Sequence, residues 1–162
     1  MSAIDDAVNW AIGIANDSSH GYDQTHRDGP DYDCSSFVCW AYYNAGLNTR
    51  PGYTPSTQTM YNVFLAAGFG DVTNSVTLSS GAGVQRGDVL LNIQNHAAMS
   101  IGNGQVVQAS SNEFGGITGG QTGDQTGQEI WITNYYNFPW NKVLRYGSGG
   151  GTGIYIVRWI PG

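Results

Sequence analysis

The pattern of apolar and polar positions divides the chain into a helical first half and a strand-rich second half. Apolar residues at helical spacing predict one helix over residues 3–15 and another over about 34–45. A third helix is predicted to start at the Thr54-Pro55 pair, which is a favourable N-cap and first-turn combination, and to end at Gly68. The first half therefore supplies three helices joined by polar loops.

Beyond residue 68 the apolar period changes to that of strands, and Gly and Asn turns separate the segments. Five strands are predicted: Asp88–Ile93, Ala97–Ile101, Gln105–Ala109, Glu129–Thr133 and Lys142–Tyr146. Helices followed by strands indicate an α+β fold, with the helices packed on a central antiparallel sheet of about five to six strands.

The glycine-rich segments mark loops and boundaries. Residues 1–146 are expected to form one domain, followed by a Gly/Ser linker at 147–153. The apolar segment 154–162 is either a last edge strand or the start of a further module. The glycine-rich stretch 114–127 lies between two predicted strands, and it is either disordered or a structured loop that forms one wall of a site.

Composition narrows the class of partner. The 162 residues include 24 Gly, only 11% are charged, and the net charge of −6 argues against nucleic acid as a ligand. A polar but uncharged surface suits a polar polymer such as a glycan. The sequence shows neither a signal peptide nor a stretch of about 20 apolar residues that could span a bilayer. We expect a soluble monomer that binds neither nucleic acid nor membranes.

Of the two cysteines, Cys34 has the setting of a nucleophile. Cys39 follows Phe37-Val38 and fits a small buried residue, and a spacing of five residues on a helix disfavours a disulfide between the two. Cys34 instead lies among Asp and Ser residues at the start of a helix, where the helix dipole and free N–H groups favour a thiolate. The alternative is a buried structural cysteine.

A cysteine nucleophile needs a base, and the chain contains three histidines. His96 starts a predicted strand whose same face continues with Ala98 and Ser100, and these small residues would let the cysteine helix approach. The alternative is that His96 only begins a strand and has no catalytic role. His20 and His26 lie in a polar loop, and together with Asp23 they match no established zinc spacing, so we expect no metal and no cofactor.

Four motifs in order resemble the NlpC/P60 cysteine peptidases. They are Asp33-Cys34-Ser35-Ser36, Arg86-Gly87-Asp88-Val89-Leu90, Asn95-His96-Ala97-Ala98-Met99 and Gly102-Asn103-Gly104-Gln105-Val106-Val107. The run His26-Arg27-Asp28-Gly29-Pro30, with Tyr135-Tyr136 and Val143–Tyr146, is more similar to the bacteriophage endolysin amidases. The resemblance covers residues 1–146 and implies a papain-like fold in which Cys34 attacks a peptidoglycan amide, His96 is the base, and Gln108 orients the imidazole.

Gln108 departs from the family, which often has His at this position. A three-residue loop Gly102-Asn103-Gly104 would place Gln108 opposite Ala98, on the face of His96, and this is the predicted geometry. A two-residue turn would place Gln108 opposite Met99, on the wrong face. Glu113 is then the best substitute, since related amidases use a glutamate at a comparable distance from their histidine.

Further residues are candidates for substrate binding. Tyr22 matches a family tyrosine that lines the active site, although a packing role is the alternative. Arg27 either binds a stem-peptide carboxylate or pairs with one of the nearby aspartates Asp28, Asp31 and Asp33. The remaining candidates are Asp33, Ser35, Ser36 and Glu113, and the backbone N–H of Cys34 is expected to serve as an oxyanion donor.

The resemblance implies the catalytic domain of a phage endolysin that forms an acyl-enzyme and lyses bacterial walls. Cleavage of the N-acetylmuramoyl-L-alanine bond is favoured over cleavage next to D-glutamate or D-glutamine within the stem peptide. Such a lysin would reach the wall through holin pores. A non-catalytic wall-binding module and a zinc hydrolase that uses the three histidines are the alternatives from other classes.

Overall fold

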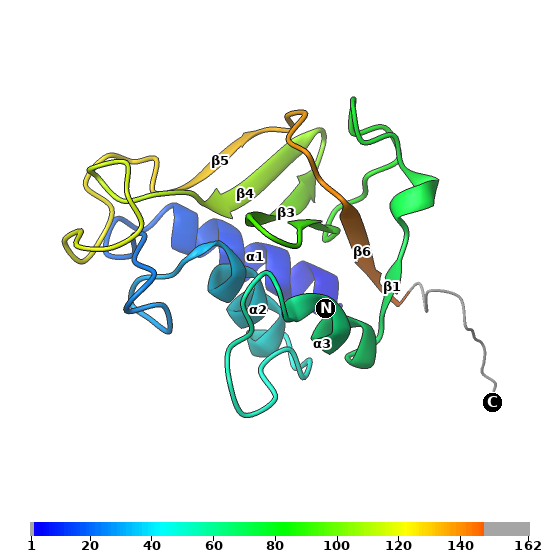
Figure 1. Ribbon diagram of the computed structural model, residues 1–162, viewed down its shortest axis with the longest axis horizontal. Coiled ribbons are helices and arrows are strands. Elements are labelled where there is room, and N and C mark those ends of the chain that lie inside the picture. Colours follow the sequence, from blue (N-terminus) through cyan, green and yellow to red (C-terminus); the bar gives the residue numbers. More distant parts are fainter. Residues whose placement is uncertain (1, 148–162) are drawn as a thin grey trace.

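The computed structural model describes residues 2–147 and shows three helices packed on one open sheet (Figure 1). The helices are α1 (Ala3–Ala15), α2 (Cys34–Asn44) and α3 (Met60–Ala66), with a 3-10 turn η1 (Thr73–Ser75). The strands are β1 (Phe69–Asp71), β2 (Val89–Asn92), β3 (His96–Gly102), β4 (Gln105–Ala109), β5 (Ile130–Asn134) and β6 (Lys142–Tyr146). The predicted linker beyond Gly147 and the segment 154–162 lie outside the described residues.

The sheet has six strands in the order β1-β6-β2-β3-β4-β5, and every pairing is antiparallel. The α+β class, with N-terminal helices on an antiparallel sheet, is thus confirmed. The strand β1 was not predicted because it is only three residues long and contains Gly70, which gives no alternating apolar signal. Strands β3 and β4 occupy neighbouring positions and carry the residues of the candidate site.

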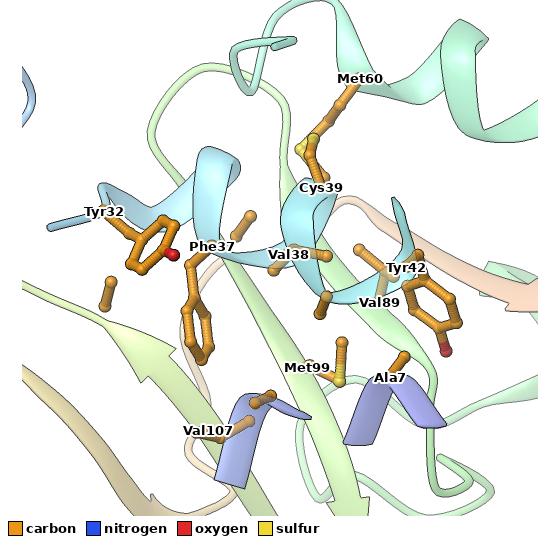
Figure 2. Close-up of a cluster of buried hydrophobic side chains, with 14 of the residues drawn as sticks. Ala7, Tyr32, Phe37, Val38, Cys39, Tyr42, Met60, Val89, Met99 and Val107 are labelled. Atoms are coloured by element: carbon orange, nitrogen blue, oxygen red, sulfur yellow. The ribbon is translucent and has the colours of Figure 1, made fainter. Parts of the chain in front are cut away.

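The main core fills the space between the helices and one face of the sheet. Phe37 and Val38 of α2 belong to one fully buried cluster with Met99 of β3 and Val107 of β4 (Figure 2). Burying a side chain of this size contributes roughly 1.5–3 kcal/mol. Cys39 is fully buried and lies beside Met60 of α3 in Figure 2, as expected for a small core residue.

A smaller core covers the opposite face of the sheet. Ala98 lies there with Leu90, Val143 and Trp140. The expectation that α2 approaches β3 across Ala98 and Ser100 is therefore wrong, because α2 packs on the face that carries Met99. The backbone N–H of Ala97, near the start of β3, donates a hydrogen bond to the Cys34 thiol.

The third helix starts later than predicted. Thr54 and Pro55 lie in an extended segment, and α3 begins only at Met60 after a turn in which Thr59 Oγ1 accepts a hydrogen bond from Ser56 N, at 3.0 Å. The carbonyl oxygens of Thr54 and Pro55 both accept hydrogen bonds from the Arg27 side chain. A tertiary contact has thus taken over the segment that local propensity assigned to a helix.

Candidate active site

The N-terminus of α2 is fixed by a reciprocal cap. Asp33 Oδ1 accepts a hydrogen bond from Ser36 N at 2.8 Å, and Ser36 Oγ accepts one from Asp33 N at 3.0 Å. A side-chain cap of this kind typically contributes about 1 kcal/mol. It makes Cys34 the first residue of the helix, so the Cys34 N–H has no acceptor within α2.

The Arg27 side chain stabilises this cap through hydrogen bonds. Its Nε donates to Asp33 Oδ2 at 2.7 Å, and its Nη2 donates to Ser35 Oγ at 2.8 Å. The same guanidinium donates to the carbonyl oxygens of Thr54 and Pro55, both at 2.8 Å. Arg27 thus follows the second of its two predicted roles and pairs with an aspartate.

The cap and its hydrogen bonds to Arg27 involve most of the side chains that were predicted to bind substrate. Both carboxylate oxygens of Asp33 accept hydrogen bonds within the protein, and Ser36 is fully buried. Ser35 Oγ donates to Asp33 Oδ1 at 3.2 Å while it accepts from Arg27. These residues hold Cys34 in place rather than present free polar groups.

The Cys34 thiol is buried at the start of β3. Burial raises the pKa of the thiol to about 11, and the charge of Asp33 acts in the same direction. Hydrogen bonds from the backbone N–H groups of Ala97 and Ser35 lower that pKa but do not outweigh burial. The expectation that the helix N-terminus favours a thiolate is therefore wrong for the resting state, since the free thiol predominates at neutral pH.

His96 and Gln108 form a direct contact. His96 Nε2 lies 2.8 Å from Gln108 Oε1. An amide oxygen only accepts hydrogen bonds, so Nε2 carries the imidazole proton and Nδ1 is free to take one. Burial lowers the pKa of His96 more than the contact with Gln108 raises it. The neutral, proton-accepting form thus predominates at neutral pH.

A bulge brings Gln108 to the correct face. The connection of β3 to β4 is a two-residue turn at Asn103 and Gly104, in place of the predicted three-residue loop. The register shifts by one residue between Ser100 and Gly102, so that Met99 pairs with Val107. The next residue, Gln108, therefore lies opposite Ala98. Its side chain is on the same face of the sheet as His96, because the extra residue in the bulge reverses which face the following side chains occupy.

An aromatic segment between β5 and β6 completes the surroundings of His96. The Trp140 ring stacks on the imidazole at a centroid distance of 5.7 Å, and Phe138 meets it edge-on at 5.6 Å. The Tyr136 hydroxyl donates to Gln108 Oε1 at 2.7 Å. Sequence reasoning assigned these three residues no role at the site, although the density of aromatic residues directly after a strand was an available signal.

A pocket of about 560 Å³ opens beside Cys34. Its polar lining consists mainly of amides and hydroxyls, among them Gln24, Gln58, Gln94 and Asn95. The ring of Tyr22 also lines the pocket, and burial together with the charge of Cys34 raises the pKa of its hydroxyl. Tyr22 therefore remains a hydrogen-bond donor beside the thiol.

The glycine-rich segment is a structured loop that reaches the pocket. The N–H groups of Gly21 and Gly123 both donate to Asp31 Oδ1, at 2.9 and 3.0 Å. Ile117, at the pocket rim, accepts a hydrogen bond from Gln24 N at 2.8 Å through its carbonyl. A Cβ atom on Gly21 would lie 2.0 Å from the Gly123 carbonyl oxygen, so this close approach requires glycine.

Glu113 and the other two histidines lie apart from this arrangement. Glu113 Oε2 accepts a hydrogen bond from Gln121 N within the glycine-rich loop, while Gln108 is the residue in contact with His96. His20 Nδ1 is 2.7 Å from Pro30 O, and His26 Nδ1 is 2.9 Å from Asp23 Oδ2. Within residues 2–147 no cluster of three His, Cys, Asp or Glu side chains could hold a metal ion.

Comparison with known proteins identifies the family of the chain. A family model described as an endolysin-like domain matches residues 28–107 and 106–149. The chain belongs to the endolysin-like domain family. The matched range includes Cys34, His96 and Gln108, and the resemblance to the endolysin and NlpC/P60 proteins is confirmed.

The fold of this endolysin-like domain is shared with a solved structure. NlpC2 from Trichomonas vaginalis is 17% identical, with a TM-score of 0.53 over 90% of this chain and 47% of its own. NlpC1 from the same organism is 18% identical, with a TM-score of 0.49 over 87% of this chain and 44% of its own. The chain thus spans about half the length of these proteins. Among curated proteins none matches the sequence significantly.

The family match relates this chain to endolysins, and the likeness to NlpC2 is one of fold. Across residues 2–147 of this endolysin-like domain, no helix is both long enough and apolar enough to cross a membrane.

Proposed function

We propose that this endolysin-like domain hydrolyses an amide bond of bacterial peptidoglycan, with Cys34 as nucleophile and His96 as general base. One observation carries the proposal: the Cys34 thiol receives a hydrogen bond from the N–H of Ala97, the residue after His96, while Gln108 holds the proton on His96 Nε2. This arrangement supplies a nucleophile, a proton acceptor and an orienting group from three separate elements.

The reaction starts from two neutral groups. His96 Nδ1 takes the thiol proton as the sulfur attacks the amide carbonyl, so that proton transfer accompanies formation of the C–S bond. In this mechanism the Cys34 N–H, at the start of α2, and the hydroxyl of Tyr22, which lines the pocket, donate to the oxygen that becomes negative. The protonated imidazole then gives its proton to the departing amine as the C–N bond breaks, leaving a thioester. His96 next activates the water that hydrolyses the thioester and releases Cys34.

The pocket favours the N-acetylmuramoyl-L-alanine bond. Its charged lining residues, Arg27 and Asp33, bind one another at 2.7 Å and so offer little charge to a ligand. Amide and hydroxyl side chains such as those of Gln24 and Gln94 suit the uncharged N-acetylated sugar next to this bond. Cleavage next to D-glutamate or D-glutamine, within the stem peptide, is the alternative.

Mass spectrometry of digested walls distinguishes the two bonds. Digestion by the wild type is expected to release intact stem peptides that begin with a free L-alanine amine, and to leave muramic acid without a peptide stub. A Cys34→Ala digest serves as the blank. Recovery of muramic acid that still carries L-alanine and D-glutamate would show the endopeptidase reaction and refute the amidase assignment.

We further propose that the domain acts as a bacteriolytic phage endolysin, as a monomer that reaches the wall through holin pores. The family match supports this setting, and the uncharged pocket supports a wall polymer as the substrate.

The neutral resting pair predicts an unusual pH dependence. Because burial lowers the pKa of His96, kcat/KM should decline in acid only below the ordinary histidine pKa of about 6.5. No alkaline decline is expected until the pH approaches the Cys34 pKa of about 11. A pH–rate profile on soluble wall fragments measures both limits.

Alkylation by iodoacetamide checks the same pair independently of turnover. Only the thiolate reacts, so the rate of Cys34 alkylation should rise by about tenfold per pH unit above pH 7. The buried Cys39 thiol, whose pKa is also raised by burial, gives the background rate in the Cys34→Ala variant. An alkylation rate that is already at its plateau at pH 7 would instead indicate a thiolate–imidazolium pair and contradict this prediction.

A further inference from the structure

One hydrogen bond at the site has no place in the mechanism described so far. The Tyr136 hydroxyl donates to Gln108 Oε1 at 2.7 Å, and His96 Nε2 lies 2.8 Å from the same oxygen. Tyr136 comes from the segment between β5 and β6, well separated in sequence from both partners. One amide oxygen thus has two neighbours that can donate a hydrogen bond to it.

The orientation of this amide decides which imidazole nitrogen is the base. If the Gln108 amide turned over, its NH₂ group would face His96 Nε2 and would require that nitrogen to accept. The imidazole proton would then sit on Nδ1, and His96 could not take the Cys34 proton there. An incorrect tautomer of a catalytic histidine can cost about 10⁴-fold in kcat.

The Tyr136 hydroxyl favours the productive orientation. A phenolic oxygen shares its lone pair with the ring, so it donates a hydrogen bond more strongly than it accepts one. Burial, followed by the charge of Cys34, raises the pKa of Tyr136, while the contact with Gln108 lowers it. The hydroxyl therefore keeps its proton throughout the pH range in which the enzyme would act.

The Tyr136 ring is itself held in place. It packs against Trp140 at a centroid distance of 5.7 Å and edge-on against Phe138 at 6.1 Å. Trp140 Nε1 donates to the Tyr136 carbonyl oxygen at 3.2 Å. The same two rings flank His96. One aromatic cluster thus orients the imidazole ring and carries the hydroxyl that acts on its amide partner.

We propose that Tyr136 is a positioning residue: by donating to Gln108 Oε1, it keeps the amide oxygen on His96 Nε2 and so leaves Nδ1 free as the base. The inference rests on the proposed function of Cys34 and His96, and it extends the orienting group from one residue to two. Tyr136 acts through Gln108 and need not touch the substrate.

The test compares Tyr136→Phe with Tyr135→Phe. Phenylalanine preserves the ring packing at both positions, and the Tyr135 hydroxyl donates to the Leu78 carbonyl instead of to Gln108. Tyr136→Phe is expected to lower kcat on wall fragments by at least about tenfold, a fraction of the cost of a fully wrong tautomer. KM should stay within about twofold, because the residue acts on the base and not on substrate binding. Tyr135→Phe should leave both constants unchanged.

Nitrogen-15 NMR of the imidazole supplies a readout that needs no turnover. In a Cys34→Ala background, His96 should show the proton on Nε2, and adding Tyr136→Phe should shift the population towards the Nδ1–H tautomer. Adding Gln108→Glu to Tyr136→Phe should restore the Nε2–H tautomer, because a carboxylate offers only acceptors. In the enzyme with Cys34 intact, the same Gln108→Glu change should move the acidic limit of kcat/KM to higher pH.

Each outcome bears on the proposal separately from the reaction. An unchanged kcat together with an unchanged His96 tautomer in Tyr136→Phe would overturn the role of Tyr136. A tautomer shift in a protein whose wild type cleaves no peptidoglycan would uphold the positioning role and refute the proposed function. Failure of Gln108→Glu to restore the tautomer would show that Tyr136 does not act through the amide, which also overturns the proposal.

Discussion

Cys34→Ala is expected to reduce peptidoglycan hydrolysis by at least about 10⁴-fold, because removal of a nucleophile eliminates the covalent route altogether. The fold should survive, since the thiol is a small group at the N-terminus of α2 and the cap of the helix does not use it. The free energy of unfolding should change by no more than about 1 kcal/mol. Loss of turbidity in a wall suspension measures the activity, and urea unfolding measures the stability.

Cys39→Ala is the matched control. Cys39 lies in the same helix and is fully buried, so its truncation should cost stability while the hydrolysis per folded molecule stays at the wild-type level. Undiminished lysis by folded Cys34→Ala would refute the cysteine mechanism. A wild type that sediments with walls but releases no fragments would instead identify a wall-binding module.

Arg27→Met is expected to lower the free energy of unfolding by about 3 kcal/mol, since it leaves the buried Asp33 carboxylate without its charged partner. Methionine keeps most of the aliphatic stem but loses all four hydrogen bonds to Asp33, Ser35, Thr54 and Pro55. Activity should fall as well, because the hydrogen bonds of Arg27 hold the start of α2 in place. Thermal and urea unfolding, followed by assays at a temperature where the variant is folded, separate the two effects.

Arg50→Met controls for the loss of one positive charge. Arg50 lies over the Trp40 ring at 3.7 Å and donates to Thr54 Oγ1, and partly exposed contacts of this kind are worth about 0.5–1 kcal/mol. A variant at Arg27 that is as stable as the one at Arg50, yet binds substrate poorly, would restore the reading of Arg27 as a ligand for a substrate carboxylate.

The sequence was most informative where local chemistry determines the structure. The helix start at Cys34 follows from Asp33 and Ser36, which cap it within four residues of chain. Strand β4 was found with its observed bounds, Gln105–Ala109, because the Asn103-Gly104 turn directly precedes its β-branched residues Val106 and Val107. Local signals of this kind are enough to define the helices and most of the sheet.

The candidate site was harder to predict because it depends on contacts between distant segments. Gln108 was assigned to the face of His96, but through a three-residue loop, whereas the structure uses a two-residue turn and a bulge near Ile101. Gly102 lies at that bulge with a φ of 88°, but a glycine beside Asn103-Gly104 fits either arrangement in the sequence. The bond of Tyr136 to Gln108 spans 28 positions in the sequence, and it depends on how the β5–β6 segment folds back.

Arg27 was recognised as a candidate residue from the sequence, but only some of its hydrogen-bond partners were predicted. The sequence left two roles open, a ligand for a stem-peptide carboxylate or a partner of a nearby aspartate. The carbonyl oxygens of Thr54 and Pro55 that it binds have no signature in the sequence. A guanidinium removed from solvent forms hydrogen bonds with the acceptors that the fold brings near it, and only the three-dimensional structure identifies those acceptors.

The way in which the glycine-rich loop is attached has a consequence for how such domains diversify. Asp31 joins the glycine-rich loop to the segment at Gly21 by accepting hydrogen bonds from the backbone N–H groups of Gly21 and Gly123. Glu129 Oε1 likewise accepts a hydrogen bond from Tyr22 N at 3.0 Å. Backbone groups are present whatever side chains the loop carries. The exposed side chains of Phe114 and Ile117 can therefore be replaced without loss of the hydrogen bonds that attach the loop.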